Sequence, residues 1–472
     1  MSAKVRTVLL EEIAAEQKNA MVGGPFGSNL VSKDYVDKGV PVIRGQNMGG
    51  RWVSGEFAYV TPQKADSLSA NTARPGDLVF TQRGTLGQVS IVPNGEYDRY
   101  IVSQSQMKIT VNPALADVSF LYYVFTSPAQ LTYIKINAIQ VGVPHTNLGI
   151  LRKTPVQLPD LLTQQRIAAV LRSLDDKIQL NNQINQTLEQ MAQAIFKSWF
   201  VGFEPVKAKI AVLEAGGSAA DAELAAMQAI SGKKSDQLEQ MANEQPEKYG
   251  ELCATAELFP SAMQESELGE IPEGWEVSQI GDEVTVVGGG TPSTKIPEYW
   301  RDGDIHWTTP RDLSNLNDKI LTDTERKITS AGLAKISSGL LPIDTVLMSS
   351  RAPVGYLALA KVPVAVNQGY IAMKCEKQLS SEYVLQWCES RMEEIKNRAS
   401  GTTFAEISKK NFNAIPVVVP HQSLILAYTK QAKSIYKKIE MLAKESRDLA
   451  DLRDTLLPQL LSGSITVKNM EA

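Results

Sequence analysis

The longest regular pattern in the chain is a run of large apolar residues that recur every three or four positions between Asp160 and Phe200. Pro159 precedes this run, and no proline or glycine interrupts it. Such spacing places the apolar side chains along one narrow face of a helix. The pattern predicts one long helix over residues 160–203, with an apolar seam made of Leu174, Ile178, Leu188 and Ile195.

A second stretch with the same pattern follows Pro420, and it predicts another long helix with a short tail over residues 421–472. A single offset in residue number aligns its seam, and the proline before it, with those of the first stretch. Helices of matched register are expected to pair as a coiled coil, and two unrelated amphipathic core helices are the alternative. The second seam comprises Ile435, Ile439, Leu442, Leu449 and Leu456.

Short runs of β-forming residues, separated by turn residues, occupy much of the first 159 positions. They lie at residues 40–45, 76–84, 88–93 and 106–111. Residues 274–420 repeat this order, so that Arg83 aligns with Arg351 and Gln104 with Gln368. A repeat of this length indicates duplicated domains. The sequence therefore predicts two similar mixed α/β domains, at residues 1–159 and 274–420.

Composition limits the class of protein. A chain of 472 residues is too long for a single hydrophobic core. No apolar run is long enough to cross a membrane, and the N-terminus is too acidic for a signal peptide. The three cysteines are scattered, which fits a reducing cytoplasm, and three histidines argue against a histidine-rich metal centre. We predict a cytoplasmic protein that holds no metal.

Residues 204–273 differ from both predicted domains. They contain 14 acidic and 5 basic side chains, many alanines and few large apolar residues. This composition predicts helical fragments in a mobile connecting segment. Basic residues outnumber acidic ones in the rest of the chain, which permits a DNA-facing surface but does not require one.

Motifs that would indicate catalysis are missing. The segment GGGTPSTK at 288–295 resembles a phosphate-binding loop, but Thr294 stands where that motif needs a glycine. No dinucleotide-binding glycine pattern follows a predicted strand, and no GxSxG turn presents a nucleophile. The sequence therefore predicts no catalytic residue.

Polar side chains on glycine-rich turns are the remaining candidates for chemistry. Arginine pairs with guanine, and asparagine or glutamine with adenine, in the major groove, while short polar side chains hold phosphates. Polar turns that bind nothing are the ordinary alternative. The candidate DNA-contacting residues are Gln82, Arg83, Thr85, Gln104, Gln106, Thr308, Arg311, Ser350, Arg351, Asn367 and Gln368.

Five segments together give the chain a family resemblance. They are the helix starts at 155–178 and 415–439, FKSWFVGFEPVKAK at 196–209, SELGEIPEGWEV at 266–277 and GGGTPSTKIPEYW at 288–300. In this order they resemble the specificity (S) subunit of a type I restriction-modification system. The second helix start lacks the Gln-Arg-Ile of the first, so contacts to a partner subunit are expected to differ between the halves.

This resemblance implies that each α/β domain is a target recognition domain that reads one half of a bipartite, asymmetric site in double-stranded DNA. The two long helices would pair antiparallel as a spacer, in a pseudo-two-fold arrangement. Two methyltransferase (M) subunits would methylate adenine with S-adenosylmethionine, and restriction (R) subunits would use ATP and Mg. The chain itself would bind no cofactor. An intracellular scaffold that binds proteins is the alternative, and salt-dependent duplex binding distinguishes the two.

Overall fold

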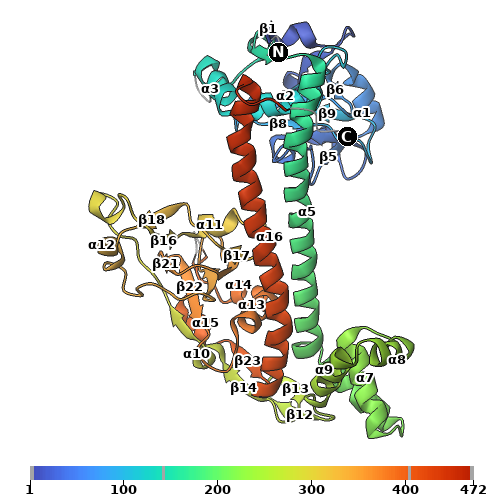
Figure 1. The fold of residues 1–472 in the computed structure, drawn as a ribbon, viewed down its shortest axis with the longest axis vertical. Coiled ribbons are helices and arrows are strands. Elements are labelled where there is room, and N and C mark those ends of the chain that lie inside the picture. Colours follow the sequence, from blue (N-terminus) through green and yellow to red (C-terminus); the bar gives the residue numbers. More distant parts are fainter. Residues whose placement is uncertain (1–4, 141–143, 402–404, 468–472) are drawn as a thin grey trace. The chain divides into compact units, whose positions relative to one another are not determined.

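The chain folds into two compact units, and its ribbon is drawn in Figure 1. Each unit has a hydrophobic core. The structure is a computed structural model that describes residues 5–140, 144–401 and 405–467. Unit 1 consists of residues 1–178 and 448–472, and unit 2 consists of residues 179–447. Parts of the predicted segments lie outside the described residues, namely 1–4, 141–143, 402–404 and the tail 468–472.

The main sheet of unit 1 is antiparallel and has the strand order β2-β10-β7-β8. Successive residues of a strand point to opposite faces, so one strand can supply two cores. Phe80 packs on Phe125 of the helix above the sheet, while Val79 joins Val102 of a second sheet. The elements are β2 (Met21–Gly23), β7 (Leu78–Thr81), β8 (Val89–Ile91), β10 (Gln106–Ile109) and α2 (Val118–Thr126).

The second sheet of unit 1 has the order β3-β5-β4-β9-β6, and its central pair, β4 and β9, is parallel. A separate antiparallel pair, β1 with β11, leads the chain into the first long helix. The strands are β1 (Arg6–Leu9), β3 (Tyr35–Val36), β4 (Val40–Ile43), β5 (Ala58–Val60), β6 (Thr72–Ala73), β9 (Tyr100–Val102) and β11 (Pro155–Leu158).

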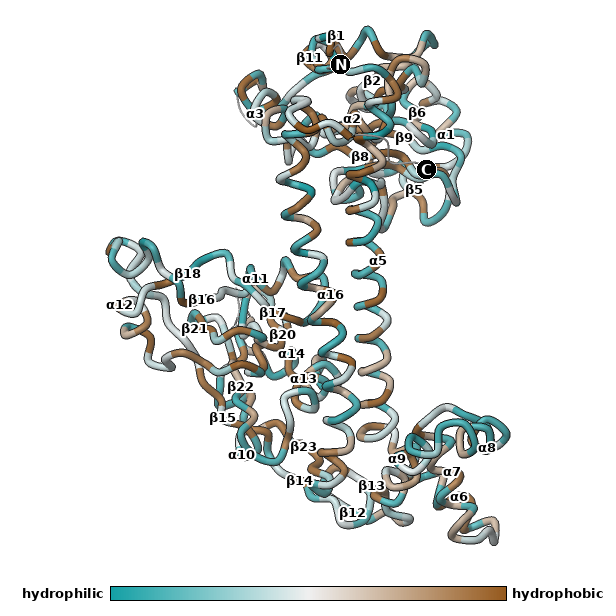
Figure 2. Tube along the Cα trace, viewed as in Figure 1, coloured by the Kyte–Doolittle hydropathy of each residue, from teal (hydrophilic) through white to brown (hydrophobic). Residues whose placement is uncertain are grey.

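Unit 2 repeats this architecture. Its main sheet has the order β15-β22-β19-β20-β17, a second sheet pairs β16 with β21 in parallel, and β14 pairs with β23. The hydropathy of the chain follows this plan, because the buried strands β19 to β22 are largely hydrophobic (Figure 2). The strands are β14 (Glu276–Gln279), β15 (Thr285–Val287), β16 (Ile305–Thr308), β17 (Ile320–Leu321), β18 (Arg326–Ile328), β19 (Val346–Ser349), β20 (Leu357–Ala360), β21 (Val364–Val366), β22 (Tyr370–Lys374) and β23 (Pro416–Val419). The predicted duplication of a mixed α/β domain is therefore confirmed.

Two long helices take part in both units: α5 (Leu161–Phe200) and α16 (Gln422–Ser462). Asp160 caps the first, since its carboxylate accepts a hydrogen bond from the Thr163 amide at 3.0 Å. Helix α13 (Ser381–Ser390) packs on the main sheet of unit 2, as α2 does in unit 1. Helix α13 ends where the chain turns at Arg391 into α14 (Met392–Asn397).

Within each unit the two long helices pair in antiparallel directions. In unit 1, Arg453 donates to Asp175 at 2.8 Å, and Leu457 and Leu460 join the core around Leu171. In unit 2, Asn181 donates to Glu445 at 2.8 Å, and Asn185 donates to the carbonyl of Ile439 at 3.3 Å. Residue numbers therefore increase along α5 as they decrease along α16, which is the antiparallel direction. The predicted seam residues are all buried or half-buried: Leu174, Ile178, Leu188, Ile195, Ile435, Ile439, Leu442, Leu449 and Leu456.

The acidic segment at 204–273 has a small core of its own, which the sequence did not predict. It folds into α6 (Glu204–Glu214), α7 (Ala219–Ser231), α8 (Ser235–Glu244), α9 (Pro246–Glu257) and a hairpin of β12 (Met263–Ser266) with β13 (Gly269–Pro272). Alanines such as Ala226 and Ala256 are fully buried, so the helices approach closely despite few large side chains. Buried Lys209 donates to Glu223 and to the Phe259 carbonyl, each at 2.7 Å.

Candidate nucleic-acid interface

Three loops meet at one end of the main sheet in unit 1. The strand register places the end of β2, the end of β7 and the start of β10 side by side. We call the segments that extend from these positions loop cluster 1: residues 23–30, 82–88 and 103–105. Hydrogen bonds join them, since the Gln82 amide donates to the Ser105 carbonyl at 2.6 Å and the Gln104 side chain donates to the Gly27 carbonyl at 2.8 Å.

The same three loops recur in unit 2, where β15, β19 and β22 supply the sheet end. Loop cluster 2 comprises residues 288–295, 350–356 and 367–369. The Ser350 amide donates to the Gly369 carbonyl at 2.8 Å, and the Thr291 hydroxyl donates to the Gln368 side chain at 2.7 Å. The aligned glutamines, Gln104 and Gln368, therefore each contact the glycine-rich loop of their own unit.

A further strand-like contact is also duplicated. The carbonyl of Gln82 accepts a hydrogen bond from the Thr146 amide, and that of Ser350 from the Ile407 amide, both at 3.0 Å. Each loop that carries the aligned arginine is thus held from two sides by backbone groups. Backbone bonds of this kind fix the loops without using the arginine side chains.

Eight of the predicted DNA-contacting residues are at least partly accessible in the structure. Arg83 and Arg351 belong to the duplicated loops, and Arg311 lies on α11 (Pro310–Ser314), next to loop cluster 2. The exposed members are Arg83, Thr85, Gln104, Arg311 and Gln368, and the half-buried ones are Gln82, Arg351 and Asn367. These side chains offer the donors and acceptors that base edges and phosphates bind.

Three predicted residues are buried, and we remove them from the candidate DNA-contacting set. The Thr308 hydroxyl pairs with the Tyr370 hydroxyl at 2.9 Å, and Ser350 is held through its backbone. Gln106 is enclosed as well: with its amide oriented to satisfy both groups, it donates to the Ile43 carbonyl and accepts from the Gly45 amide. Because these residues are enclosed, their polar groups serve the fold and do not face a ligand.

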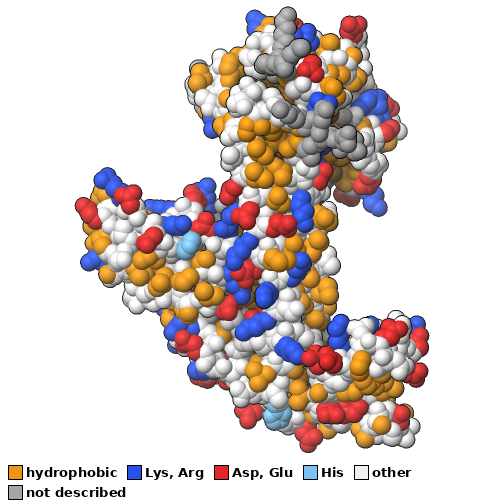
Figure 3. Space-filling model, viewed as in Figure 1, with side chains coloured by type: hydrophobic (Ala, Val, Ile, Leu, Met, Phe, Trp, Pro, Cys, Tyr) orange, Lys and Arg blue, Asp and Glu red, His pale blue; other side chains and the backbone are white. Residues whose placement is uncertain are grey.

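The arginines of the two clusters differ in their surroundings. Arg351 lies 3.7 Å from the carboxylate of Glu406, and both side chains keep contact with solvent, so the pair is weak and can open. The backbone of Arg351 also forms an isolated β-bridge with Glu406, and the backbone of Arg83 forms the corresponding bridge with His145. Charges of both signs are mixed on the face seen in Figure 3.

Glycine at position 289 is required by a close backbone approach. A Cβ atom there would lie 1.8 Å from the Val366 carbonyl oxygen, whereas a Cβ at Gly290 would meet nothing within 4 Å. We expect Gly289→Ala to displace the loop and lower the free energy of unfolding by about 1–3 kcal/mol. Gly290→Ala is the matched control and should unfold at nearly the wild-type temperature. Equal melting temperatures for the two variants would contradict this loop geometry.

Polar contacts that no local sequence pattern predicts attach each α/β domain to the helix segment of its own unit. In unit 1, the Tyr123 hydroxyl donates to Asp175 at 2.6 Å, and Arg51 bonds Asp176. In unit 2, Asn185 donates to Asp318 at 3.0 Å. Burial raises the pKa of Asp318 above its usual range, and the hydrogen bonds that the carboxylate accepts offset part of this rise.

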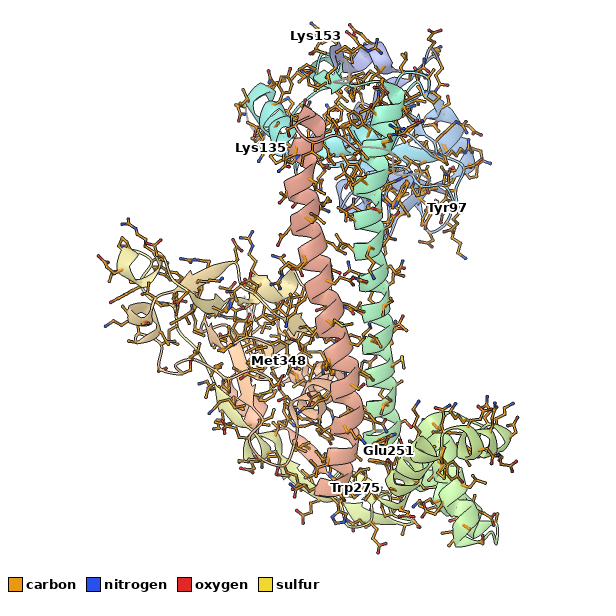
Figure 4. The ribbon with its side chains drawn as sticks, viewed as in Figure 1. Tyr97, Lys135, Lys153, Glu251, Trp275 and Met348 are labelled. Carbon is orange, nitrogen blue, oxygen red and sulfur yellow. The ribbon has the colours of Figure 1, made fainter. Side chains whose placement is uncertain are left out.

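Across residues 5–140, 144–401 and 405–467, no three His, Cys, Asp or Glu side chains are grouped so that they could hold a metal ion. In the same part of the chain, every helix is too short or too polar to cross a membrane. Lys153, which precedes the first long helix and is labelled in Figure 4, is exposed to solvent.

Comparison with known proteins shows what the chain is similar to. A sequence model described as "Type I restriction modification DNA specificity domain" matches residues 29–190 and 272–441. The chain is 34% identical over 403 residues to the type I restriction enzyme HindI specificity subunit of Haemophilus influenzae, which covers 83% of this chain and 87% of that protein. It is 38% identical over 164 residues to the type I restriction enzyme MjaIX specificity subunit of Methanocaldococcus jannaschii, covering 34% and 38%. The crystal structure of the type I restriction-modification S subunit from M. genitalium has a similar fold, with a TM-score of 0.50, 13% identity, and 99% and 97% of the two chains covered.

Proposed function

Because the chain belongs to the family of type I restriction-modification DNA specificity subunits, we propose that its two loop clusters each read one half of a bipartite DNA site. The single observation that carries this proposal is the duplicated arrangement of an arginine and a glutamine on hydrogen-bonded loops. Arg83 with Gln104, and Arg351 with Gln368, occupy equivalent places in their units. Arginine and glutamine are side chains that discriminate guanine and adenine in the major groove.

The chemistry would then reside on partner subunits. We propose that two methyltransferase subunits, with S-adenosylmethionine, take an adenine of each half-site out of the base stack and methylate it. Restriction subunits, with ATP and Mg, would join for cleavage. The chain would supply no catalytic residue and bind no cofactor, and it would act in the cytoplasm, where its DNA target lies.

The two long helices are proposed to set the number of unread base pairs between the half-sites. At a rise of 1.5 Å per residue, helices of 40 and 41 residues are each about 60 Å long. The antiparallel contacts within each unit, such as Asn185 with the Ile439 carbonyl, would keep their register constant. A fixed register would give a fixed spacing rather than a range of spacings.

The test is to express the chain with its methyltransferase partner and read the methylated sequence from the host genome. We expect one bipartite motif. Arg351→Ala should relax only the half-site read by unit 2, and Arg83→Ala only the other. The loss of a good bidentate contact is worth about 1–3 kcal/mol of discrimination against a wrong base.

Arg301→Ala is the control, because Arg301 is exposed in unit 2 but lies outside loop cluster 2. It should leave the motif unchanged. Absence of any bipartite motif in the wild-type experiment would contradict the proposed function. Equal relaxation of both half-sites by Arg351→Ala would instead show that this arginine supports the fold.

A further inference from the structure

Phe26 has the most exposed large apolar side chain in the described part of the chain, at 80% exposure. It lies in the glycine-rich loop of loop cluster 1, where its neighbours are glycine, proline, serine and asparagine. A phenyl ring left in water is unfavourable for the isolated protein, and single exposed apolar residues are common. Phe26 differs from such residues because it lies among the candidate DNA-contacting residues of unit 1.

The loop that carries Phe26 is fixed to its surroundings. The Gln104 side chain donates to the carbonyls of Gly27 at 2.8 Å and Leu30 at 3.1 Å. The Asn71 side chain donates to the Gly23 carbonyl at 2.7 Å on the other side. Bonds on both flanks of Phe26 hold the loop in place, so its ring is presented to solvent by an ordered backbone.

Gly24 anchors the same loop by close packing. A Cβ atom at this position would lie 1.9 Å from the Ser103 carbonyl oxygen, so the loop backbone rests directly on the turn that carries Gln104. The Gln82 side chain lies on the other flank, 3.6 Å from the position of a Cβ at Gly23. Phe26 therefore belongs to a loop whose first residues rest on the loops that carry Gln82 and Gln104.

The glycine-rich loop of loop cluster 2 has a different residue at the position that corresponds to Phe26. Alignment of the two glycine-rich loops places Thr291 opposite Phe26. The Thr291 hydroxyl is used within the cluster, where it donates to Gln368 at 2.7 Å. The two glycine-rich loops thus differ at this position, where unit 1 has a phenyl ring and unit 2 has a threonine.

We infer that Phe26 stacks against a base of the DNA at the half-site read by unit 1. This inference rests on the proposed function. Proteins insert apolar side chains between base steps, and an aromatic ring stacks on any base because every base has a π face. Duplex DNA is favoured over a protein partner, because protein interfaces group several apolar residues in a buried centre, whereas Phe26 stands alone among polar neighbours.

The stacking contact has a distinct signature in DNA-binding measurements. With the full chain bound to its methyltransferase subunit, Phe26→Ala should weaken binding to the cognate duplex about tenfold, from the usual contribution of one stacked base. The slope of affinity against salt should not change, because Phe26 neutralises no phosphate. Phe26→Trp should retain wild-type affinity. Ile136→Ala is the control, because it truncates another exposed apolar side chain of unit 1, 74% exposed and outside loop cluster 1, and it should have little effect.

A fluorescent base analogue locates the contact. 2-Aminopurine placed singly at successive positions of the duplex should report, at one step of the first half-site, a change in stacking on binding that Phe26→Ala removes. Unchanged affinity of Phe26→Ala would overturn the inference. So would weaker assembly with the methyltransferase subunit in the absence of DNA, since the ring would then be a protein contact. Failure of the proposed function itself is recognised separately, because the wild-type complex would then show no preference for any bipartite duplex.

Discussion

Ile439→Asp is expected to unfold unit 2 and to abolish binding to the methyltransferase subunit. Ile439 is 0% exposed on α16, in the core where the two long helices meet. An ionised carboxylate has no partner at this apolar position, and an unpaired buried charge belongs to the most destabilising class of substitution, at about 4–5 kcal/mol or more. Urea unfolding followed by circular dichroism, together with co-purification with the partner, measures both effects.

Met441→Asp is the matched control, because it introduces the same charge two residues later on the same helix at a side chain that is 53% exposed. It should unfold close to the wild-type midpoint. If the two aspartate variants were equally stable, α16 would not bury the face that contains Ile439, and the pairing of the long helices in unit 2 would be misassigned.

Trp199→Ala is expected to lower the free energy of unfolding by about 3–5 kcal/mol, the usual cost of removing a buried aromatic ring. Trp199 is 1% exposed near the end of α5, and its ring meets that of Phe259 edge-on at 5.2 Å. It also contacts Phe200, which in turn packs on Trp275 at the start of the second domain, labelled in Figure 4. The substitution would leave a cavity where the helix, the acidic segment and the second domain join within unit 2.

Met191→Ala serves as the control for this prediction. Met191 lies on the same helix and is 49% exposed, so truncating it leaves no enclosed cavity. Chemical unfolding monitored by tryptophan fluorescence would be affected by the lost tryptophan, so circular dichroism is the better signal. Similar midpoints for the two variants would mean that the aromatic cluster contributes little to unit 2.

The long helices were predictable because their signal is periodic and local. The predicted seam residues are buried or half-buried, but several of the most deeply buried side chains of the two helices, such as Leu171 and Tyr436, do not belong to the predicted seam. Here each helix also packs on an α/β domain, so its buried face is wider than a two-stranded coiled coil requires. The parallel pairing of β4 with β9 could not be predicted from local patterns, because the paired residues lie about 60 positions apart in the chain.

The sequence predicted which loops lie together, and that these loops contact DNA stays a prediction. Glycine-rich turns between strands marked the loops that meet at each sheet end, because a sheet brings the ends of neighbouring strands together. Thr308 and Gln106 looked equivalent to Gln104 in the sequence, yet they face inward. A one-residue difference in a strand reverses the direction of a side chain, and no local pattern decides it for a polar residue. No local pattern predicts that Phe26 is exposed, because aromatic residues are ordinarily buried.

The C-terminal part of α16 completes the core of unit 1, where Leu457 and Leu460 pack with residues of the first domain. During translation, the whole of residues 179–447 must be synthesised before these leucines exist. At about 5–20 residues per second, that interval lasts roughly 15–50 s. The N-terminal domain therefore waits on the ribosome with part of its apolar surface uncovered.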